Sequence, residues 1–167
     1  TSGQKIAPAA NGLQGAAEIA ANLSAVEAKL RYEFRDRTLL GNALLHRSHI
    51  HVTGQDREQS NERLEFLGDA VLGLVANEEL YHRYPDRSEG DLTKMKSLLV
   101  CGAHLSEVAV EFDLGANIRM SRSEAATGGR QRSSILADTT EALIGAVYLD
   151  GGLGPAREVI RRLVLKS

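Results

Sequence analysis

The sequence predicts an all-α fold. Apolar residues recur at spacings of three and four along most of the chain, which is the period of an amphipathic helix. No stretch alternates apolar and polar residues as a half-buried strand does, and no internal repeat is visible. Pro85 and the pair Gly151-Gly152 stand where helical stretches end, so the chain divides into several helices.

The beginning of the chain differs from the rest in composition. Residues 1–21 are rich in alanine, glycine, asparagine and glutamine and have no sustained apolar period, so we expect a loose arm or linker there. Residues 22–167 are expected to form one domain, a length that can bury a core without disulfides or structural metal.

The domain is expected to open with two helices. Val26, Leu30 and Phe34 are spaced by four residues, and Asp36 stands where it could cap a second helix. The polar segment 46–60 is predicted to be a loop that leads into the next helix.

Two longer helices follow and are expected to pair as an antiparallel hairpin. The first is predicted over residues 62–84, because Pro85 disfavours helix in the residue before it. The second begins after Ser88, with Asp91 three residues on as a variant of the capping box, and keeps its apolar period as far as Phe112.

The last part of the chain is predicted to add two more helices. A polar segment, 121–134, leads into a helix over 135–149 that Gly151 and Gly152 end. Pro155 suits the first turn of the final helix.

Composition limits the functions that the chain can have. Cys101 is the only cysteine, which excludes an internal disulfide and a cysteine-rich zinc site and suits a reducing cytoplasm. No apolar run reaches the roughly 20 residues of a membrane span, and the N-terminus lacks the order of a signal peptide, so we expect a soluble cytoplasmic protein without a membrane partner. The net charge of -2 disfavours nucleic-acid binding unless bound cations reverse the local sign.

Three acids share one face of the helix predicted over 62–84. Glu62, Glu65 and Asp69 stand at positions i, i+3 and i+7, which fall within an arc of about 60°. Asp69 lies inside the apolar run 66–76, so it is expected to be buried, where an unpaired carboxylate is costly.

The helix predicted over 135–149 repeats the pattern with Asp138 and Glu141 at i and i+3. Stacked carboxylates repel, so one of them should raise its pKa or find a cation. A hard divalent cation shared by both helices would explain all five acids, since such cations prefer oxygen ligands. The alternative is that Glu62 and Glu65 are solvated and that Asp69 pairs with an arginine such as Arg63.

These residues resemble the ribonuclease III family. Glu62 to Leu72 match its signature Glu-Arg-Leu-Glu-Phe-Leu-Gly-Asp-Ala-Val-Leu, and similarity continues in His46-Arg47-Ser48, in Ser88 to Lys94, and in Ile135 to Gly152. Order and spacing agree from about Leu30 to Leu165. The departures are Leu45, where many members have threonine, and Leu99 to Gly102 in place of the usual Leu-Val-Asn.

The resemblance implies a helical endonuclease domain that forms a homodimer through the signature helix and cuts double-stranded RNA. Products would carry 5′-phosphate and 3′-hydroxyl ends with short 3′ overhangs. It implies Mg²⁺ as the cofactor, with Mn²⁺ as a substitute, held by Glu65, Asp69, Asp138 and Glu141. Two supporting catalytic acids, acting through water or a second ion, fall on Glu62 and Glu89, the latter by resemblance alone.

The resemblance also bears on how the chain would bind RNA and on which other functions it could have. Bacterial members usually continue into a double-stranded RNA-binding domain, which this chain lacks. Two other classes stay open: a ribonuclease III-like RNA-binding or structural module without activity, and an oxidase-type metal bundle suggested by Glu79 and His82. His46 and Arg47 are expected to orient loops. Candidate RNA-backbone contacts are the cations Lys94, Lys96, Arg119, Arg122, Arg130 and Arg132.

Overall fold

The structure, a computed structural model, describes residues 9–53 and 56–166, without the side chains of 9–14 and 51–53. Within these ranges the chain is helical and has no strand beyond one isolated bridge between Leu45 and Arg119. The all-α prediction is therefore confirmed. The α-helices are α1 (Ala9–Leu30), α2 (Arg37–Ala43), α3 (Arg47–Thr53), α4 (Glu62–Arg83), α5 (Glu89–Val100), α6 (Gly102–Glu111), α7 (Arg122–Ala126), α8 (Ser133–Gly151) and α9 (Leu153–Ile160).

Shorter turns join the helices. Three are 3-10 turns and the last is π-helical: η1 (Arg57–Gln59), η2 (Leu114–Asn117), η3 (Gly129–Gln131) and η4 (Arg161–Leu165). None of the described helices combines the length and hydropathy that a bilayer-spanning segment needs.

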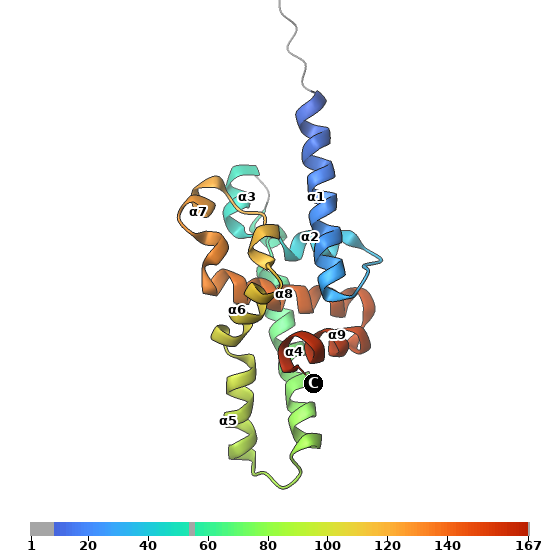
Figure 1. Cartoon of the computed structure of the whole chain (residues 1–167), viewed down its shortest axis with the longest axis vertical. Helices are drawn as coiled ribbons and strands as arrows, with labels where there is room; N and C mark the ends of the chain where they lie inside the picture. The colour runs from blue at the N-terminus through green and yellow to red at the C-terminus, as the bar shows by residue number, and fades with distance from the viewer. Residues whose placement is uncertain (1–8, 54–55, 167) are drawn as a thin grey trace, which may run out of the picture.

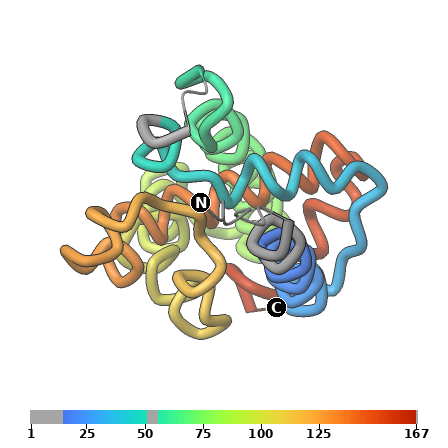
Figure 2. The backbone as a smooth tube through the Cα atoms, turned by 90° about the horizontal axis from the view of Figure 1, so that it is seen from above, coloured from blue at the N-terminus to red at the C-terminus, as the bar shows by residue number. Residues whose placement is uncertain are grey.

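Helix α8 is the centre of the fold. It packs against α2, α4, α6 and α9, so most of its side chains from Ile135 to Val147 are buried. Helices α4 and α5 lie side by side as the predicted antiparallel hairpin, and α1 projects from the opposite end (Figure 1). From above, α1 is seen nearly along its axis (Figure 2), and α2 packs against α8.

Two glycines allow α4 and α8 to cross at close range. A Cβ atom on Gly68 would lie 1.7 Å from the main-chain oxygen of Glu141, and one on Gly145 would lie 2.4 Å from that of Leu64. Side chains at these positions would push the two backbones apart. The crossing therefore depends on glycine in both helices.

The C-terminal end of α8 is anchored by Asp150. Its carboxylate accepts a hydrogen bond of 2.6 Å from the hydroxyl of Tyr32 and two of 2.9 Å from the main-chain N–H groups of Arg35 and Asp36. Burial and this acidic partner raise the pKa of Tyr32 to about 12. The turn between α1 and α2 is thereby fixed to the end of α8.

Several local predictions are confirmed. Asp36 caps α2 by accepting a hydrogen bond from the N–H of Thr38, and Ser88 caps α5 by accepting one from the N–H of Asp91. Helix α8 ends at Gly152, which has a φ of 87°, a conformation that favours glycine.

Other local predictions are wrong. The segment 1–21 is helical from Ala9 onward and not a loose arm, because its alanines favour helix without an apolar stripe; residues 1–8 lie outside the described residues. The helix predicted from Ser88 to Phe112 is broken at Cys101, whose backbone is extended. Helix α5 packs against α4, whereas α6 changes direction and packs against α8. The segment 46–60, predicted to be a loop, contains the short helices α3 and η1, and the polar segment 121–134 contains α7 and η3.

The crossing gives a test of the fold. We expect Gly68→Ala to lower the free energy of unfolding by about 3 kcal/mol or more, because the added methyl group meets rigid backbone. Gly73→Ala, in the same helix, meets only the flexible end of Lys96 at 3.6 Å, so we expect a gain of up to about 1 kcal/mol from helix propensity. Urea unfolding of both variants measures the difference, and equal effects would contradict this account.

Candidate metal centre

Carboxylates from α4 and α8 meet beside the helix crossing. Oxygen atoms of Glu65, Asp138 and Glu141 all lie within 4.8 Å of one another, and all three side chains are half-buried. Glu65 lies one turn before Gly68 on α4, and the other two stand on consecutive turns of α8. The close crossing therefore brings acids 73 and 76 positions apart in the sequence to one point.

Asp69 lies next to this cluster, where it shares a side-chain hydrogen bond with Glu141. It is exposed, so the prediction that it is buried is wrong. The reason is that α4 leaves one face uncovered in the single chain: Phe66 is 84% exposed and Leu74 is 52% exposed. The alternative pairing of Asp69 with Arg63 is not among the ion pairs of the described residues.

The clustered acids have strongly perturbed protonation. Burial, followed by the proximity and the hydrogen bond of Asp138, raises the pKa of Glu65 to about 7. Burial, followed by the hydrogen bond and charge of Asp69, raises the pKa of Glu141 to about 8. Burial also raises the pKa of Asp138. Negative charge is thus concentrated here without enough positive charge to balance it.

The remaining two predicted catalytic acids differ in position: Glu62 borders the same pocket as Glu65 and Asp138, whereas Glu89 does not. Glu62 forms ion pairs with Arg57 at 3.2 Å and Arg47 at 3.6 Å, and the hydrogen bond from Arg57 is the main reason why the pKa of Glu62 is lowered. Glu89 is exposed at the start of α5 and borders a different pocket with Tyr81 and Lys96. The chain therefore brings Glu65, Asp138 and Glu141 together with Asp69, and leaves Glu89 outside.

Some of the predicted RNA-contacting cations have intramolecular partners. Arg130 donates hydrogen bonds of 2.9 and 2.7 Å to the main-chain oxygens of Gly115 and Ile118. Arg132 pairs with Glu124 and donates to the oxygen of Thr127. RNA contact stays a prediction for these two and for Lys94, Lys96, Arg119 and Arg122.

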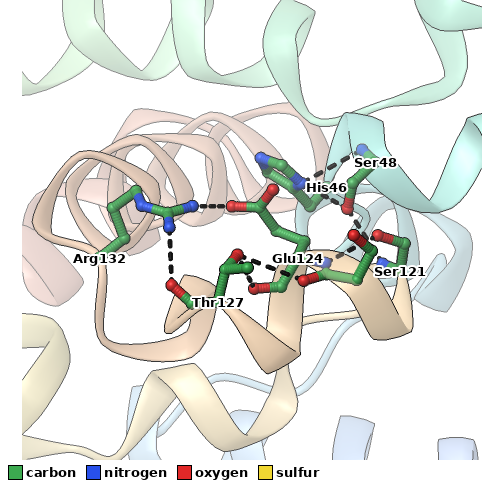
Figure 3. A network of polar contacts seen from close by, with 7 residues as sticks. His46, Ser48, Ser121, Glu124, Thr127 and Arg132 are labelled. Atoms are coloured by element: carbon green, nitrogen blue, oxygen red, sulfur yellow. Dashed lines mark hydrogen bonds and ion pairs between the residues drawn. The ribbon is translucent and has the colours of Figure 1, made fainter.

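A pocket of about 380 Å³ opens on the acids Glu62, Glu65 and Asp138. Its other lining includes His46, Arg47 and Arg57. Of these, Arg57 did not stand out in the sequence, because the loop in which it lies carries no recognisable pattern. His46 is fixed by Ser48, which also contacts Ser121 at the start of α7 (Figure 3). Burial, ahead of the charge of Arg47, lowers the pKa of His46.

A family model described as ribonuclease-III-like matches residues 36–167, which is well over half of the chain. The chain belongs to the ribonuclease III family. The resemblance seen in the sequence is thereby confirmed.

Individual relatives agree with this assignment. Ribonuclease 3 of Caldanaerobacter subterraneus subsp. tengcongensis is 50% identical over 143 residues, which are 86% of this chain and 60% of the relative. Ribonuclease 3 of Thermobifida fusca is 54% identical over 125 residues, which are 75% of this chain and 51% of the relative. The chain thus spans between half and three fifths of the length of these curated relatives.

The fold agrees as well. The crystal structure of the nuclease domain of ribonuclease III from Campylobacter jejuni superimposes with a TM-score of 0.79 at 42% identity, covering 87% of this chain and 95% of that chain. A second structure of that nuclease domain gives a TM-score of 0.80. The helical arrangement of this ribonuclease III-family chain is therefore that of a nuclease domain.

The raised pKa of Glu141 makes stability depend on pH when no metal is added. The folded chain holds a proton on Glu141 up to about pH 8, whereas the ordinary pKa is 4.5, so folding binds a proton and stability falls as pH rises between these values. Glu141→Gln should remove this loss and be more stable than the parent at pH 8 by on the order of 1 kcal/mol, allowing for solvent screening.

Melting temperatures in chelator at pH 5 and pH 8 measure this effect. We expect Glu141→Gln to gain about 2–4 °C over the parent at pH 8 and little at pH 5. Glu107→Gln, an exposed position of α6, is the matched control and should follow the parent. The same pH dependence in all three proteins would contradict the proposed protonation.

Proposed function

We propose that this domain hydrolyses double-stranded RNA endonucleolytically with Mg²⁺, for which Mn²⁺ substitutes, in RNA processing. The observation that carries the proposal is the convergence of Glu65, Asp138 and Glu141 in a chain of the ribonuclease III family. The names of its relatives, ribonuclease 3, support the activity. Products are proposed to carry 5′-phosphate and 3′-hydroxyl ends with short 3′ overhangs.

The acids fit a hard divalent cation. Their donors are all carboxylate oxygens, the ligand type that Mg²⁺ prefers. We propose that Glu65, Asp69, Asp138 and Glu141 hold the metal, which would supply an activated water and stabilise the developing charge on phosphate. Metal binding would require the protons on Glu65 and Glu141 to leave, so both carboxylates would be free to coordinate.

Glu62 and Glu89 are proposed to support the reaction less directly, through water or a second ion. The ion pairs of Glu62 with Arg47 and Arg57 support a further task, which is to hold these cations at the rim of the pocket. Glu89 stays a proposal that rests on the family resemblance, since it lies outside the cluster.

Metal binding also reconciles RNA binding with a net charge of -2. The acidic cluster repels phosphate when it is empty and attracts it once a divalent cation is bound. We therefore expect the affinity for RNA to depend on metal. The single free cysteine, Cys101, supports a cytoplasmic location.

A homodimer through α4 is part of the proposal. The exposed face of α4 carries Phe66, and next to it lies a pocket of about 630 Å³ bordered by Leu39, Leu67 and Leu149. A protruding ring and a hollow on one face suit a two-fold interface, in which each subunit fills the hollow of the other. The nuclease domain from Campylobacter jejuni has a region involved in dimer formation. Two centres in one dimer would cut the two strands of a duplex.

The alternatives receive less support. A module without activity would have no need for a cluster of half-buried acids that raises the pKa of Glu65 and Glu141. An oxidase-type site is disfavoured, because Glu79 pairs with Arg161 and His82 packs edge-on against Tyr81.

Cleavage of a labelled RNA duplex tests the activity. We expect Mg²⁺-dependent cutting that chelator abolishes, and a loss on the order of 10³-fold in Asp138→Asn and Glu141→Gln, because the metal stabilises the transition state by several kcal/mol. Glu78→Gln, which removes a carboxylate of α4 remote from the cluster, should cut like the parent. An intact duplex after long incubation of the parent with Mg²⁺ would exclude the enzyme.

Sedimentation tests the dimer. Phe66→Glu places a charge in the proposed interface, so we expect a dimeric parent and a monomeric variant at micromolar concentration. Val110→Glu alters an apolar side chain of α6 that is 64% exposed and should leave the dimer intact. A parent that sediments as a monomer at all concentrations would contradict the proposal.

A further inference from the structure

The pocket beside the acidic cluster has two chemically different walls. One wall carries the carboxylates of Glu65 and Asp138. The other carries His46, which precedes α3, with Arg47 from α3 and Arg57 from η1. We call this second wall, which consists of His46, Arg47 and Arg57, the donor wall.

The hydrogen bonds of His46 fix which ring nitrogen carries the proton. Its Nδ1 accepts a hydrogen bond of 3.1 Å from the main-chain N–H of Ser48, which can only donate. The Ser48 hydroxyl lies 2.8 Å from the same nitrogen and accepts a hydrogen bond of 3.0 Å from the N–H of Ser121, so its own proton is free to point at Nδ1. Nδ1 is therefore an acceptor, and the proton of the neutral ring is on Nε2.

This arrangement leaves one donor of a pocket-lining residue unused. Nε2 lies on the side of the ring away from Ser48 (Figure 3), and no described residue accepts a hydrogen bond from it. The main-chain N–H of His46 is bound to the oxygen of Arg119 at 2.9 Å, which fixes the backbone as well. His46 is thus held in place before any ligand arrives, as an electrostatic contact requires if binding is to cost little reorganisation.

The two arginines add positive charge to the same wall. Arg57 donates from Nε and Nη2 to Glu62 at 3.2 and 3.3 Å, and Nη1 of Arg47 lies 3.6 Å from the same carboxylate. Each guanidinium has five N–H donors, so most of them remain unused. Because two cations share one carboxylate, the donor wall keeps a net positive charge.

We propose that the donor wall binds a backbone phosphate of the RNA strand that lies at the acidic cluster, with His46 donating from Nε2 and the two arginines supplying charge. This inference rests on the proposed function and adds a phosphate site to it. A phosphate in the pocket would face metal-bound carboxylates on one side and hydrogen-bond donors on the other. Arg130 and Arg132 do not line this pocket, so they are not part of the proposed phosphate site.

The test compares duplex cleavage by four variants across a series of KCl concentrations. Arg47→Gln and Arg57→Gln should each lower kcat/KM and reduce the slope of its logarithm against log[KCl] by about one, because each removes one ionic phosphate contact. His46→Ala should lower kcat/KM about tenfold or more without a change in slope, since a neutral donor is lost. His46→Gln, which keeps an N–H donor near the position of Nε2, should recover most of the rate.

Arg161→Gln is the matched control. It breaks an ion pair of 3.3 Å with Glu79, comparable with that of Arg57, but does not border the pocket, so its kcat/KM and slope should match the parent. The increase in melting temperature on adding Mg²⁺ should be the same in all variants, which separates loss of phosphate contact from damage to the fold or to the acids.

The outcomes distinguish this inference from the function on which it rests. A parent that cleaves while the His46 and arginine variants all match Arg161→Gln would overturn the donor wall alone. An equal loss in His46→Gln and His46→Ala, or unchanged salt slopes in both arginine variants, would also overturn it. A parent that fails to cleave would overturn the proposed function and this inference together.

Discussion

The close crossing of α4 and α8 is the constraint on which the site depends. The main-chain oxygen of Glu141 occupies the space that a side chain on Gly68 would need, and the oxygen of Leu64 does the same at Gly145. One of the residues that forms the contact, Glu141, is also an acid of the cluster, and Glu65 follows Leu64 directly. Packing of the core and spacing of the carboxylates are therefore set by a single interaction, and any change in the first must change the second.

The carboxylates at this crossing do not add to the stability of α4 or α8. The carboxylates of Glu65 and Glu141 lose hydration and face one another, so both keep protons near neutral pH. The surrounding core is apolar and extensive, with α8 buried along most of its length, and this burial offsets the unfavourable charge. The arrangement is typical of a site whose geometry is maintained at the expense of stability, and a bound cation would reverse the balance.

Helical spacing in the sequence was enough to predict which acids share a face, because 3.6 residues per turn is a local property. It predicted the wrong environment for Asp69, since an apolar run around a helix looks the same whether it packs in its own core or on a second subunit. The break between α5 and α6 at Cys101 could not be predicted either, because the apolar spacing continues across it. The break is needed because α5 packs against α4 and α6 packs against α8. The roles of Arg57 and Ser48 arise from tertiary contacts that no spacing encodes.

Net charge was a poor guide to RNA binding because opposite charges are separated within one pocket. The net charge of -2 does not reveal that one pocket has a carboxylate wall at Glu65 and Asp138 and a donor wall around His46. The two walls require different partners. A divalent cation satisfies the first and an anion satisfies the second, so a metal-bound phosphodiester satisfies both at once, whereas a free cation or a free anion satisfies only one. The proposed pocket would therefore select for the combination of metal and phosphate, which is the chemistry that hydrolysis of an RNA backbone requires.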